Sequence, residues 1–468
     1  MNALKKYCFF LLMLFSAAAF SQPSSISKLP NIIFILADDM GYGDLGCYGQ
    51  TKINTPHIDK LAKDGTRFTN FYAGSTVCAP SRASLMTGQH TGHVTIRGNG
   101  EVPLSVADSI LPQVLKQKGY TNGMVGKWGL DLYGTIGVPE KKGWDFFAGL
   151  LHHVEGHFQK PDSAWQIINA ESRKVKIPQG MYSNEWFNQS ALSFIEQNKQ
   201  QPFFLYVSYT LPHAELVAPQ QYFKQYLNAD GSSKFSPETA QPPGLHYGPQ
   251  PFPRAAYAAM VTQVDDYVGS ITALLKKLKL EENTIVIFAS DNGTHTEGGR
   301  SLKDATQYFK SSGPLKGTKR DLYEGGIRIP FIVSWKNHVP ANTVSDYTGA
   351  FWDVVPTLAE LAGTKPPPGD GISFLTVLLN KKNEIQRQGP LYWEFYENGF
   401  KQAVRKGNWK AIRFYESVNP VRTELYDLSK DIGEKNNLSA KYPVIVKEME
   451  DLMDKEHTIS ANPLFQIR

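Results

Sequence analysis

Two pairs of oxygen-bearing side chains stand just beyond apolar runs of this chain. They are Asp38-Asp39 and Asp291-Asn292. Either pair alone is a common turn sequence. In an α/β protein, however, ligands bind beyond the carboxyl ends of parallel strands, and both pairs follow runs with the composition of buried strands. Carboxylate and amide oxygens are the ligands that Ca²⁺ or Mg²⁺ prefers, whereas Zn²⁺ favours histidine and cysteine, so the four residues predict a site for a hard cation.

A cysteine stands at the start of a predicted helix, in the run CAPSR that begins at Cys78. A lone cysteine there would usually be a buried thiol ahead of a helix cap. Arg82 follows it by about one helical turn, so both side chains can face the same pocket. The N-terminus of a helix favours an anion. Arg82 is therefore placed either to orient the group at position 78 or to hold an anionic ligand.

The segment CAPSR resembles the site at which sulfatases convert a cysteine to formylglycine. Five further motifs resemble that family in order and approximate spacing over residues 31–371, namely ADDMGYGDLGCYG, GKWG, LPHAE, SDNG and KGTKRDLYEGGIRIP. On these motifs the chain is identified as a member of the formylglycine-dependent sulfatases, which have an alkaline-phosphatase-like fold. In that family the aldehyde hydrates to a gem-diol, one hydroxyl attacks the sulfur of a sulfate ester, and collapse of the product releases inorganic sulfate and restores the aldehyde.

The resemblance implies a calcium site and a set of sulfate contacts. The calcium ligands would be Asp38, Asp39, Asp291, Asn292 and the modified Cys78, with Mg²⁺ as a possible alternative. Lys127 in GKWG and Lys316 in the last motif would hold the sulfate, and Lys rather than Arg suits a point-charge contact. Lys319 and Arg320 would be structural, with Glu324 paired to one of them.

The resemblance also assigns roles to histidines. His213, in LPHAE, would protonate the leaving alcohol, because imidazolium can deliver a proton near neutral pH. His295, three residues past Asn292, would contact the sulfate or the leaving oxygen, or merely cap its loop. Many sulfatases carry a histidine that helps product release where this chain has Gly129. His157 is the first candidate to replace it, and His153 is the second.

The pattern of the chain predicts an α/β fold with a large, mixed and mostly parallel sheet. Apolar runs at 31–37, 203–209, 284–289 and 327–335 alternate with helical patterns at 105–118, 183–197, 254–278 and 352–362. Long segments at 150–180 and 227–253, rich in Gly, Pro, His and aromatic residues, are expected to frame a substrate cleft. After the proline run 366–368 the pattern changes to strands at 391–396 and 401–415 and a helix at 444–455. We therefore expect a catalytic domain at 22–375 and a C-terminal subdomain with an antiparallel sheet at 376–468.

The N-terminus predicts export. Lys5 and Lys6 precede an apolar segment too short to span a bilayer, and small residues suit signal-peptidase cleavage after Ser21. Residues 1–21 thus form a predicted signal peptide, and the mature protein would be secreted, periplasmic or extracellular, without a membrane anchor. Its formal charge of +5 falls to about +3 without the two lysines and is not clustered, which gives no case for nucleic-acid binding. Two cysteines then remain, and if Cys78 is modified they form no disulfide.

Three classes of function fit these motifs. The first is a secreted sulfatase matured by a formylglycine-generating or an anaerobic sulfatase-maturating enzyme. Its substrate would be a sulfated glycan or oligosaccharide, with galactose or N-acetylgalactosamine sulfates favoured by the LPHAE, DNGTHTEGG and GPLKGTKRDLYEGG segments. The second is a phosphomonoesterase or phosphodiesterase of the same superfold, which usually carries Ser or Thr as nucleophile with two zinc ions and several histidines. The third is a non-catalytic protein that binds sulfated glycans, which would follow if Cys78 stayed unmodified.

Overall fold

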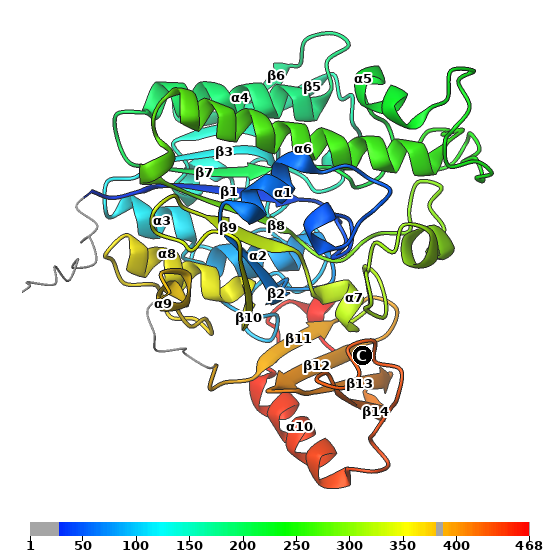
Figure 1. Ribbon diagram of the computed structural model, residues 1–468. Helices are drawn as coiled ribbons and strands as arrows, with labels where there is room; N and C mark the ends of the chain where they lie inside the picture. Colours follow the sequence, from blue (N-terminus) through cyan, green and yellow to red (C-terminus); the bar gives the residue numbers. More distant parts are fainter. Residues whose placement is uncertain (1–27, 381–386, 468) are drawn as a thin grey trace, which may run out of the picture.

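A ten-stranded mixed sheet forms the centre of the computed structural model, which describes residues 28–380 and 387–467. Its strands follow the order β10-β2-β9-β8-β1-β7-β3-β4-β5-β6 (Figure 1). Strands β8, β1, β7, β3 and β4 are parallel, and β9 is antiparallel to both β8 and β2. Their bounds are β1 Asn31–Ala37, β2 Thr66–Tyr72, β3 Thr121–Lys127, β4 Phe146–Leu150, β5 Ser163–Ile168, β6 Glu171–Lys176, β7 Phe203–Ser208, β8 Thr284–Ser290, β9 Phe331–Ser334 and β10 Thr343–Ala350.

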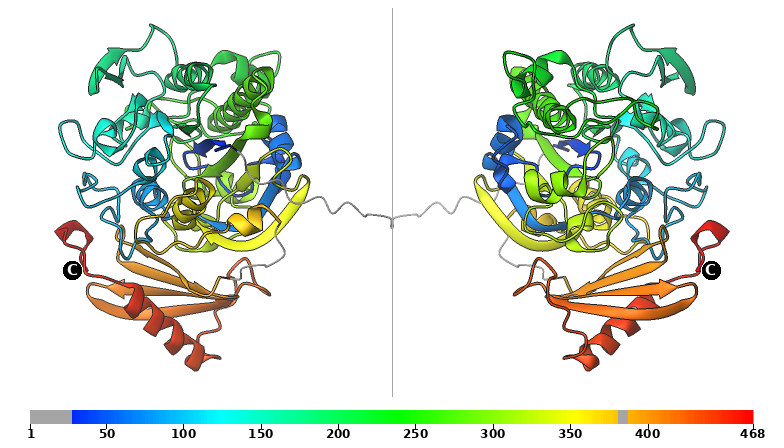
Figure 2. Two further views of the ribbon diagram at one scale, coloured as in Figure 1. Left: turned by 90° about the vertical axis from the view of Figure 1, so that its left-hand side faces the viewer. Right: turned by 90° about the vertical axis from the view of Figure 1, so that its right-hand side faces the viewer.

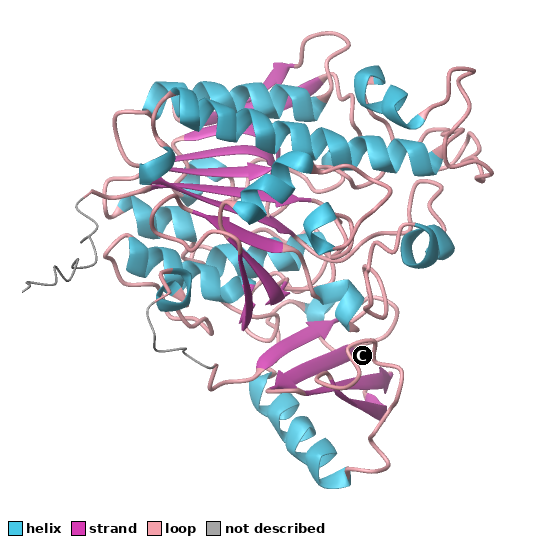
Figure 3. Ribbon diagram, viewed as in Figure 1, coloured by secondary structure: helices cyan, strands magenta, loops and turns pink. Residues whose placement is uncertain are grey.

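Helices cover both faces of this sheet (Figure 3). One face carries α1 Pro56–Lys63, α4 Ser183–Asn198, α5 Gln220–Phe223 and α6 Pro253–Lys277, and the other carries α2 Cys78–Thr87, α3 Leu111–Lys116, α8 Val354–Leu361 and α9 Leu375–Leu378. In β1 the side chains of Ile33 and Ile35 pack under α6 and its neighbours, whereas those of Phe34 and Leu36 pack on the opposite face, under α2 and its neighbours. Burial on both faces explains why this strand is continuously apolar in sequence.

A four-stranded antiparallel sheet follows in the C-terminal part of the chain. It contains β11 Leu391–Phe395, β12 Lys401–Lys406, β13 Trp409–Glu416 and β14 Asn419–Asp427, and α10 Pro443–Glu456 packs on it. Met449 and Met453 of α10 pack on one face, while Trp393 on the other face contacts Tyr72 and Trp352 of the large sheet region. This smaller sheet lies at one end of the molecule (Figure 2). The predicted fold class, an α/β sheet with an antiparallel C-terminal subdomain, is confirmed, and the boundary at residue 375 stays a prediction.

Several predicted elements have different bounds in the structure. The helix predicted at 105–118 is only α3, because the segment before it forms a turn in which Ser105 N–H donates to Asp108. The strand predicted at 327–335 is the short helix α7 Glu324–Ile327 followed by β9, separated by Pro330, which has no N–H to donate. The long segment at 150–180 contains the hairpin β5–β6, which extends the large sheet.

A buried ion cluster links the two sheets through Glu324. The sequence prediction that Glu324 pairs with Lys319 or Arg320 is wrong. The carboxylate instead lies 2.9 Å from Lys410 Nζ of β13 and 3.1 Å from Arg328 Nε, and it accepts from the Tyr72 hydroxyl at 2.7 Å. Lys410 Nζ is also 2.9 Å from Glu434, and the subdomain thus supplies one of the two cations that pair with the fully buried Glu324.

The predicted signal peptide, 1–21, lies outside the described residues. Within the part of the chain that the structure describes, none of the helices combines the length and apolar character needed to cross a membrane. Cys47 and Cys78 are both unpaired thiols, and Cys47 is only half-buried rather than buried.

Candidate functional site

The carboxyl ends of β1 and β8 bring the four predicted cation ligands together. These strands are parallel neighbours with Ala37 opposite Ser290, so the residues that follow them meet at one edge of the sheet. The Asp39 backbone N–H donates to Asp291 Oδ1 at 2.9 Å, and Asn292 Nδ2 donates to Asp39 Oδ1 at 2.6 Å. Asp38, Asp39, Asp291 and Asn292 are all fully buried.

This acidic group fits a hard divalent cation. Oxygens of Asp38, Asp39 and Asp291 lie within 4.8 Å of one another. Asp38 Oδ1 and Asn292 Oδ1 are buried and accept no hydrogen bond. Buried polar atoms without a partner are rare and costly, and a cation bound between the two pairs would satisfy both. The chemistry of the donors, oxygen throughout, suits Ca²⁺ or Mg²⁺.

Charge balance in the site is uneven. Burial raises the pKa of Asp38, but Lys127 and Arg82 outweigh it and hold that pKa well below its usual range. Burial likewise opposes ionisation of Asp39, and Lys319 reverses the effect and lowers the pKa. For Asp291, burial and the charge of Asp38 raise the pKa to about 7. Arg82 offsets only part of this rise, and a divalent cation would supply further positive charge to this third carboxylate.

Cys78 is the first residue of α2, and Arg82 lies one turn further along the helix. Cys78 is buried, and burial raises the pKa of its thiol. Arg82 Nη2 lies 2.7 Å from Asp291 Oδ2 and 3.5 Å from Asp38 Oδ1, and its Nη1 donates to the Lys127 carbonyl at 3.1 Å. The guanidinium is thus bound to the acidic group and to the end of β3. Of the two predicted roles, this geometry suits orientation of the site better than a free contact to sulfate.

Two buried ammonium groups flank the acidic pair after β1. Lys127 Nζ, at the end of β3, lies 2.7 Å from Asp38 Oδ2. Lys319 Nζ lies 2.8 Å from Asp39 Oδ2 and 3.0 Å from His213 Nε2. Their positions on either side of the pair provide two positive charges for an anion bound over it.

Lys319, rather than Lys316, supplies the second amine. Lys316 Nζ lies 3.8 Å from the centre of the Tyr323 ring and donates to the Glu434 carbonyl at 3.3 Å, so it points toward the C-terminal subdomain. Gly317, between the two lysines, has a φ of +85°, so the backbone turns there and the two side chains point in different directions. The sequence assignment of Lys316 to the site and of Lys319 to a structural role is therefore corrected.

His213 is fully buried beside Lys319. Its Nδ1 faces the Ala214 carbonyl, which places the ring proton on Nδ1, and Nε2 accepts from Lys319. Burial and the neighbouring ammonium lower the pKa of this imidazole. Glu297, 3.5 Å from both His213 Nε2 and Lys319 Nζ, supplies a further negative charge.

His295 lies behind His213, with ring centres 5.6 Å apart. Its Nδ1 accepts from the Glu297 N–H at 3.1 Å, and its Nε2 lies 3.0 Å from the Pro212 carbonyl. Both ring nitrogens thus bond to backbone. Burial and Arg300 lower its pKa to about 3, so the ring is neutral. Of the predicted alternatives, capping of the loop fits this placement best.

The segment after β4 brings two more histidines to the site. The His157 ring stacks on His213 at 4.3 Å, and its Nδ1 lies 3.4 Å from the Tyr247 hydroxyl, which donates to Glu297 at 3.1 Å. A Cβ atom added at Gly129 would lie 3.7 Å from His153 Cβ and 3.8 Å from Arg82 and Lys127 side-chain atoms. His153 therefore lies beside the space that a side chain at position 129 would enter. The φ of +70° at Gly129 explains why glycine is favoured there.

Three residues near the site have no signal in the sequence that singles them out, namely Glu297, Tyr247 and Asn99, whereas Lys319 lies in a quoted motif but was given a structural role. Tyr247 comes from the long segment 227–253, which was expected to frame a cleft. Asn99 Oδ1 accepts from the Ala79 N–H at 3.1 Å and lies 3.6 Å from Cys78 Sγ. Its distance of 21 positions from Cys78 gives no hint of that contact.

Comparison with known proteins shows the family to which this chain belongs. Residues 30–364 match the sulfatase family model, and residues 317–458 match the C-terminal model of N-sulphoglucosamine sulphohydrolase. The chain belongs to the sulfatase family, and it is a sulfuric ester hydrolase.

Relatives of known activity cover most of the chain. An N-acetylgalactosamine-6-O-sulfatase of Bacteroides thetaiotaomicron is 31% identical over 92% of this chain and 94% of its own. The N-acetylgalactosamine-6-sulfatase of Rattus norvegicus is 32% identical over 82% of this chain and 71% of its own. The crystal structure of Ps i-CgsB in complex with k-i-k-neocarrahexaose has a TM-score of 0.73 at 27% identity and covers 92% of each chain.

Proposed function

We propose that this protein hydrolyses sulfate esters of carbohydrates, with galactose or N-acetylgalactosamine sulfates favoured, and that Cys78 is converted to formylglycine for this purpose. The observation that carries the proposal is the position of Cys78, on the first turn of α2 within the electrostatic reach of Lys127, Asp38, Lys319 and Asp291. Relatives named as N-acetylgalactosamine sulfatases, and a structural neighbour in complex with k-i-k-neocarrahexaose, support the sugar class.

The residues present fit both groups that such chemistry requires. Asp38, Asp39, Asp291, Asn292 and the modified residue 78 would hold Ca²⁺, with Mg²⁺ as the alternative, and the cation would polarise a sulfate oxygen. Formylglycine, once hydrated, supplies the hydroxyl nucleophile. Arg82 fixes Asp291 through a contact at 2.7 Å, which leaves that carboxylate in place to accept the proton of the nucleophile.

Lys127 and Lys319 bind the sulfate group in this proposal. Each lysine is buried and pairs with one aspartate, and a bound cation would become the partner of those carboxylates. Together they would stabilise the negative charge on the equatorial oxygens in the transition state.

His213 donates the proton to the leaving oxygen. Its hydrogen bond from Lys319 holds the imidazole beside the sulfate site while Lys319 keeps its charge, so the proton on Nε2 comes from solvent. Burial and Lys319 lower its pKa in the free protein, and an anionic substrate adds negative charge that favours the imidazolium. General acid catalysis of this kind is worth roughly 10²–10⁴-fold.

The mutation His213→Ala is expected to lower kcat by about 10²-fold on a sugar sulfate and much less on a nitrophenyl sulfate. A sugar alkoxide must be protonated as it leaves, whereas nitrophenolate leaves without help. Measured kcat values on the two substrates test this. An equal loss on both would remove His213 as general acid and assign it a binding or structural role.

Removal of the cation with a chelator is expected to abolish turnover, and Ca²⁺ or Mg²⁺ should restore it. Zn²⁺ should not, because the donors are Asp38, Asp39, Asp291 and Asn292, all oxygen. Elemental analysis of the purified protein checks the assignment independently of activity. Stoichiometric zinc in a fully active preparation would contradict it.

We further propose that His157 replaces the histidine missing at Gly129, with His153 as the second candidate. Burial lowers the pKa of both imidazoles, to about 3 for His153, so both rings are neutral before substrate binds, and the negative charge of bound sulfate would favour their protonation. His157→Ala is expected to lower steady-state kcat by about tenfold or more while the alcohol released in the first turnover keeps its rate. Stopped-flow measurement of alcohol release separates the rate of the first turnover from the steady-state rate. His153→Ala is the variant with which His157→Ala is compared. A deficit confined to His153→Ala would transfer the role to that residue.

The experiment that tests the function as a whole is sulfate release from a panel of defined sulfated sugars. Faster release from 4- or 6-sulfated galactose or N-acetylgalactosamine than from glucosamine sulfates would support the proposal. Release of phosphate from the matching sugar phosphates at equal efficiency would contradict it. The same proposal includes secretion by a signal peptide at 1–21 and maturation by a formylglycine-generating or anaerobic maturating enzyme. It also includes a catalytic domain at 22–375 and a C-terminal subdomain at 376–468.

A further inference from the structure

The helix that carries Cys78 receives its N-terminal cap from a distant loop. Val77, the residue before α2, offers no side-chain acceptor, so the first N–H groups of the helix lack a local partner. Asn99 Oδ1 fills this place, because it accepts from the Ala79 N–H at 3.1 Å. The same oxygen lies 3.6 Å from Cys78 Sγ, so one carbonyl contacts both the helix start and the side chain at position 78.

The loop that bears Asn99 is bound to the C-terminal subdomain. Arg97, which is 3% exposed, places Nη1 2.7 Å from Glu394 Oε1 of β11 and 2.6 Å from the Thr458 carbonyl. Arg97 Nη2 adds a contact of 2.9 Å to the Thr458 hydroxyl, and Nε donates to the Val94 carbonyl at 3.1 Å. The guanidinium two residues before Asn99 is therefore fixed on every side by hydrogen bonds.

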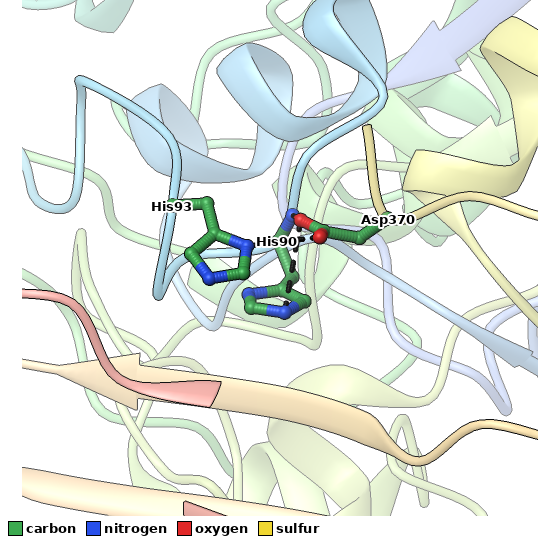
Figure 4. A group of neighbouring side chains, drawn as sticks. All are labelled: His90, His93 and Asp370. Atoms are coloured by element: carbon green, nitrogen blue, oxygen red, sulfur yellow. Dashed lines mark hydrogen bonds and ion pairs between the residues drawn. The ribbon is translucent and has the colours of Figure 1, made fainter. Parts of the chain in front are cut away.

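A second tie holds the other end of this loop (Figure 4). His93 Nδ1 lies 2.9 Å from Asp370 Oδ1, and His90 Nε2 lies 3.3 Å from Glu456 Oε2 and 3.6 Å from Asp370 Oδ2. The Gly92 N–H donates to His90 Nδ1 at 3.1 Å, which leaves the ring proton on Nε2, directed at the carboxylates. A cation at Nε2 would have to displace this proton, so the group acts as a hydrogen-bonded tie.

We propose that Asn99 is a positioning residue for the nucleophile at position 78, and that the C-terminal subdomain sets its place through the Arg97–Glu394 ion pair. This inference rests on the proposed function. Asn99 Oδ1 has two lone pairs, one used by Ala79, and the second can accept from the side chain at position 78. Asn99 then selects the rotamer of residue 78. The small sheet contributes to catalysis indirectly, because it holds the loop that carries Asn99.

The test compares Asn99→Ala with Glu394→Gln, each normalised to the fraction of residue 78 that peptide mass shows to be converted. We expect Asn99→Ala to lower kcat by about tenfold to a hundredfold, since small displacements of reacting groups have effects of that size. Glu394→Gln should lower kcat in the same direction. The double variant should be no slower than Asn99→Ala alone, because both changes act on one contact. Lys406→Ala, at an exposed ion pair of the same subdomain, is the matched control with parental kcat.

Substrate affinity separates positioning from binding. In a Cys78→Ser background, calorimetry with a sulfated monosaccharide should give the same Kd with and without Asn99→Ala, within about twofold. A kcat of Asn99→Ala within about twofold of the parent, or a loss of kcat/KM explained wholly by Kd, would overturn the inference. If Asn99→Ala fails to fold, Asn99→Ser and Glu394→Gln provide the same comparison. An inactive parent with unconverted Cys78 would instead overturn the proposed function itself.

Discussion

A Cys78→Ser variant is expected to keep the fold and to lose about a thousandfold or more in kcat on every sulfate ester. Serine offers a single hydroxyl and no aldehyde, so it cannot form a hydrate and cannot release sulfate by restoring a carbonyl. The side chain is buried at the start of α2, and a hydroxyl occupies less space than the thiol, so little effect on packing is expected. Steady-state sulfate release and thermal unfolding of the two proteins check both parts.

The matched control is Cys47→Ser, which changes the other thiol of the described residues. Cys47 is half-buried and lies beside Asp59, away from the acidic group, and burial together with Asp59 raises the pKa of its thiol. Its replacement should leave kcat unchanged. Parental turnover of the Cys78→Ser variant, or equal losses in both variants, would refute the assigned role of Cys78.

Lys319→Ala is expected to reduce kcat/KM by about 10²–10³-fold, whereas Lys316→Ala should reduce it by less than about threefold. Lys319 Nζ contacts Asp39 and His213 in the buried site, so its loss removes both a sulfate contact and a contact that holds the general acid in place. Lys316 Nζ lies instead on the Tyr323 ring. Kinetics on one sugar sulfate, with circular dichroism of each variant, provide the measurement.

Lys316→Ala serves as the control because the two lysines lie three positions apart in one segment. A large loss for Lys316→Ala with near-parental activity for Lys319→Ala would reinstate the assignment made from the motif. Lys319→Arg adds a further check. Arginine keeps the charge but not the compact ammonium, so only partial recovery is expected.

The central strands were predictable because each is buried on both faces. The continuous apolar run of β1 and the helical patterns of α4 and α6 gave bounds within about a residue or two of those observed, the usual precision of such boundaries. The hairpin β5–β6 was not predicted, because its residues at the exposed edge of the sheet lack an apolar pattern. Strand β2, with charged and polar residues among its seven, was likewise not anticipated.

At the site, the sequence predicted correctly those residues whose positions follow from the ends of neighbouring strands. Asp38, Asp39, Asp291 and Asn292 meet because β1 and β8 are neighbours, and a parallel sheet brings such ends together. It failed where backbone conformation decides direction. The positive φ of Gly317 separates the directions of Lys316 and Lys319, and it could not be inferred from the local sequence alone. The role of Asn99 could not be predicted from the sequence, because its contact with Cys78 depends on how its loop packs against the C-terminal subdomain.

The mass of the peptide containing residue 78, taken from a preparation with measured sulfatase turnover, tests the central claim most directly. Conversion of Cys78 to formylglycine replaces the thiol by an aldehyde oxygen and lowers the peptide mass by about 18 Da. The account predicts this lighter peptide, reactive with a hydrazide probe, in proportion to turnover across preparations. Full turnover from protein whose residue 78 is entirely unmodified, alkylatable cysteine would contradict it.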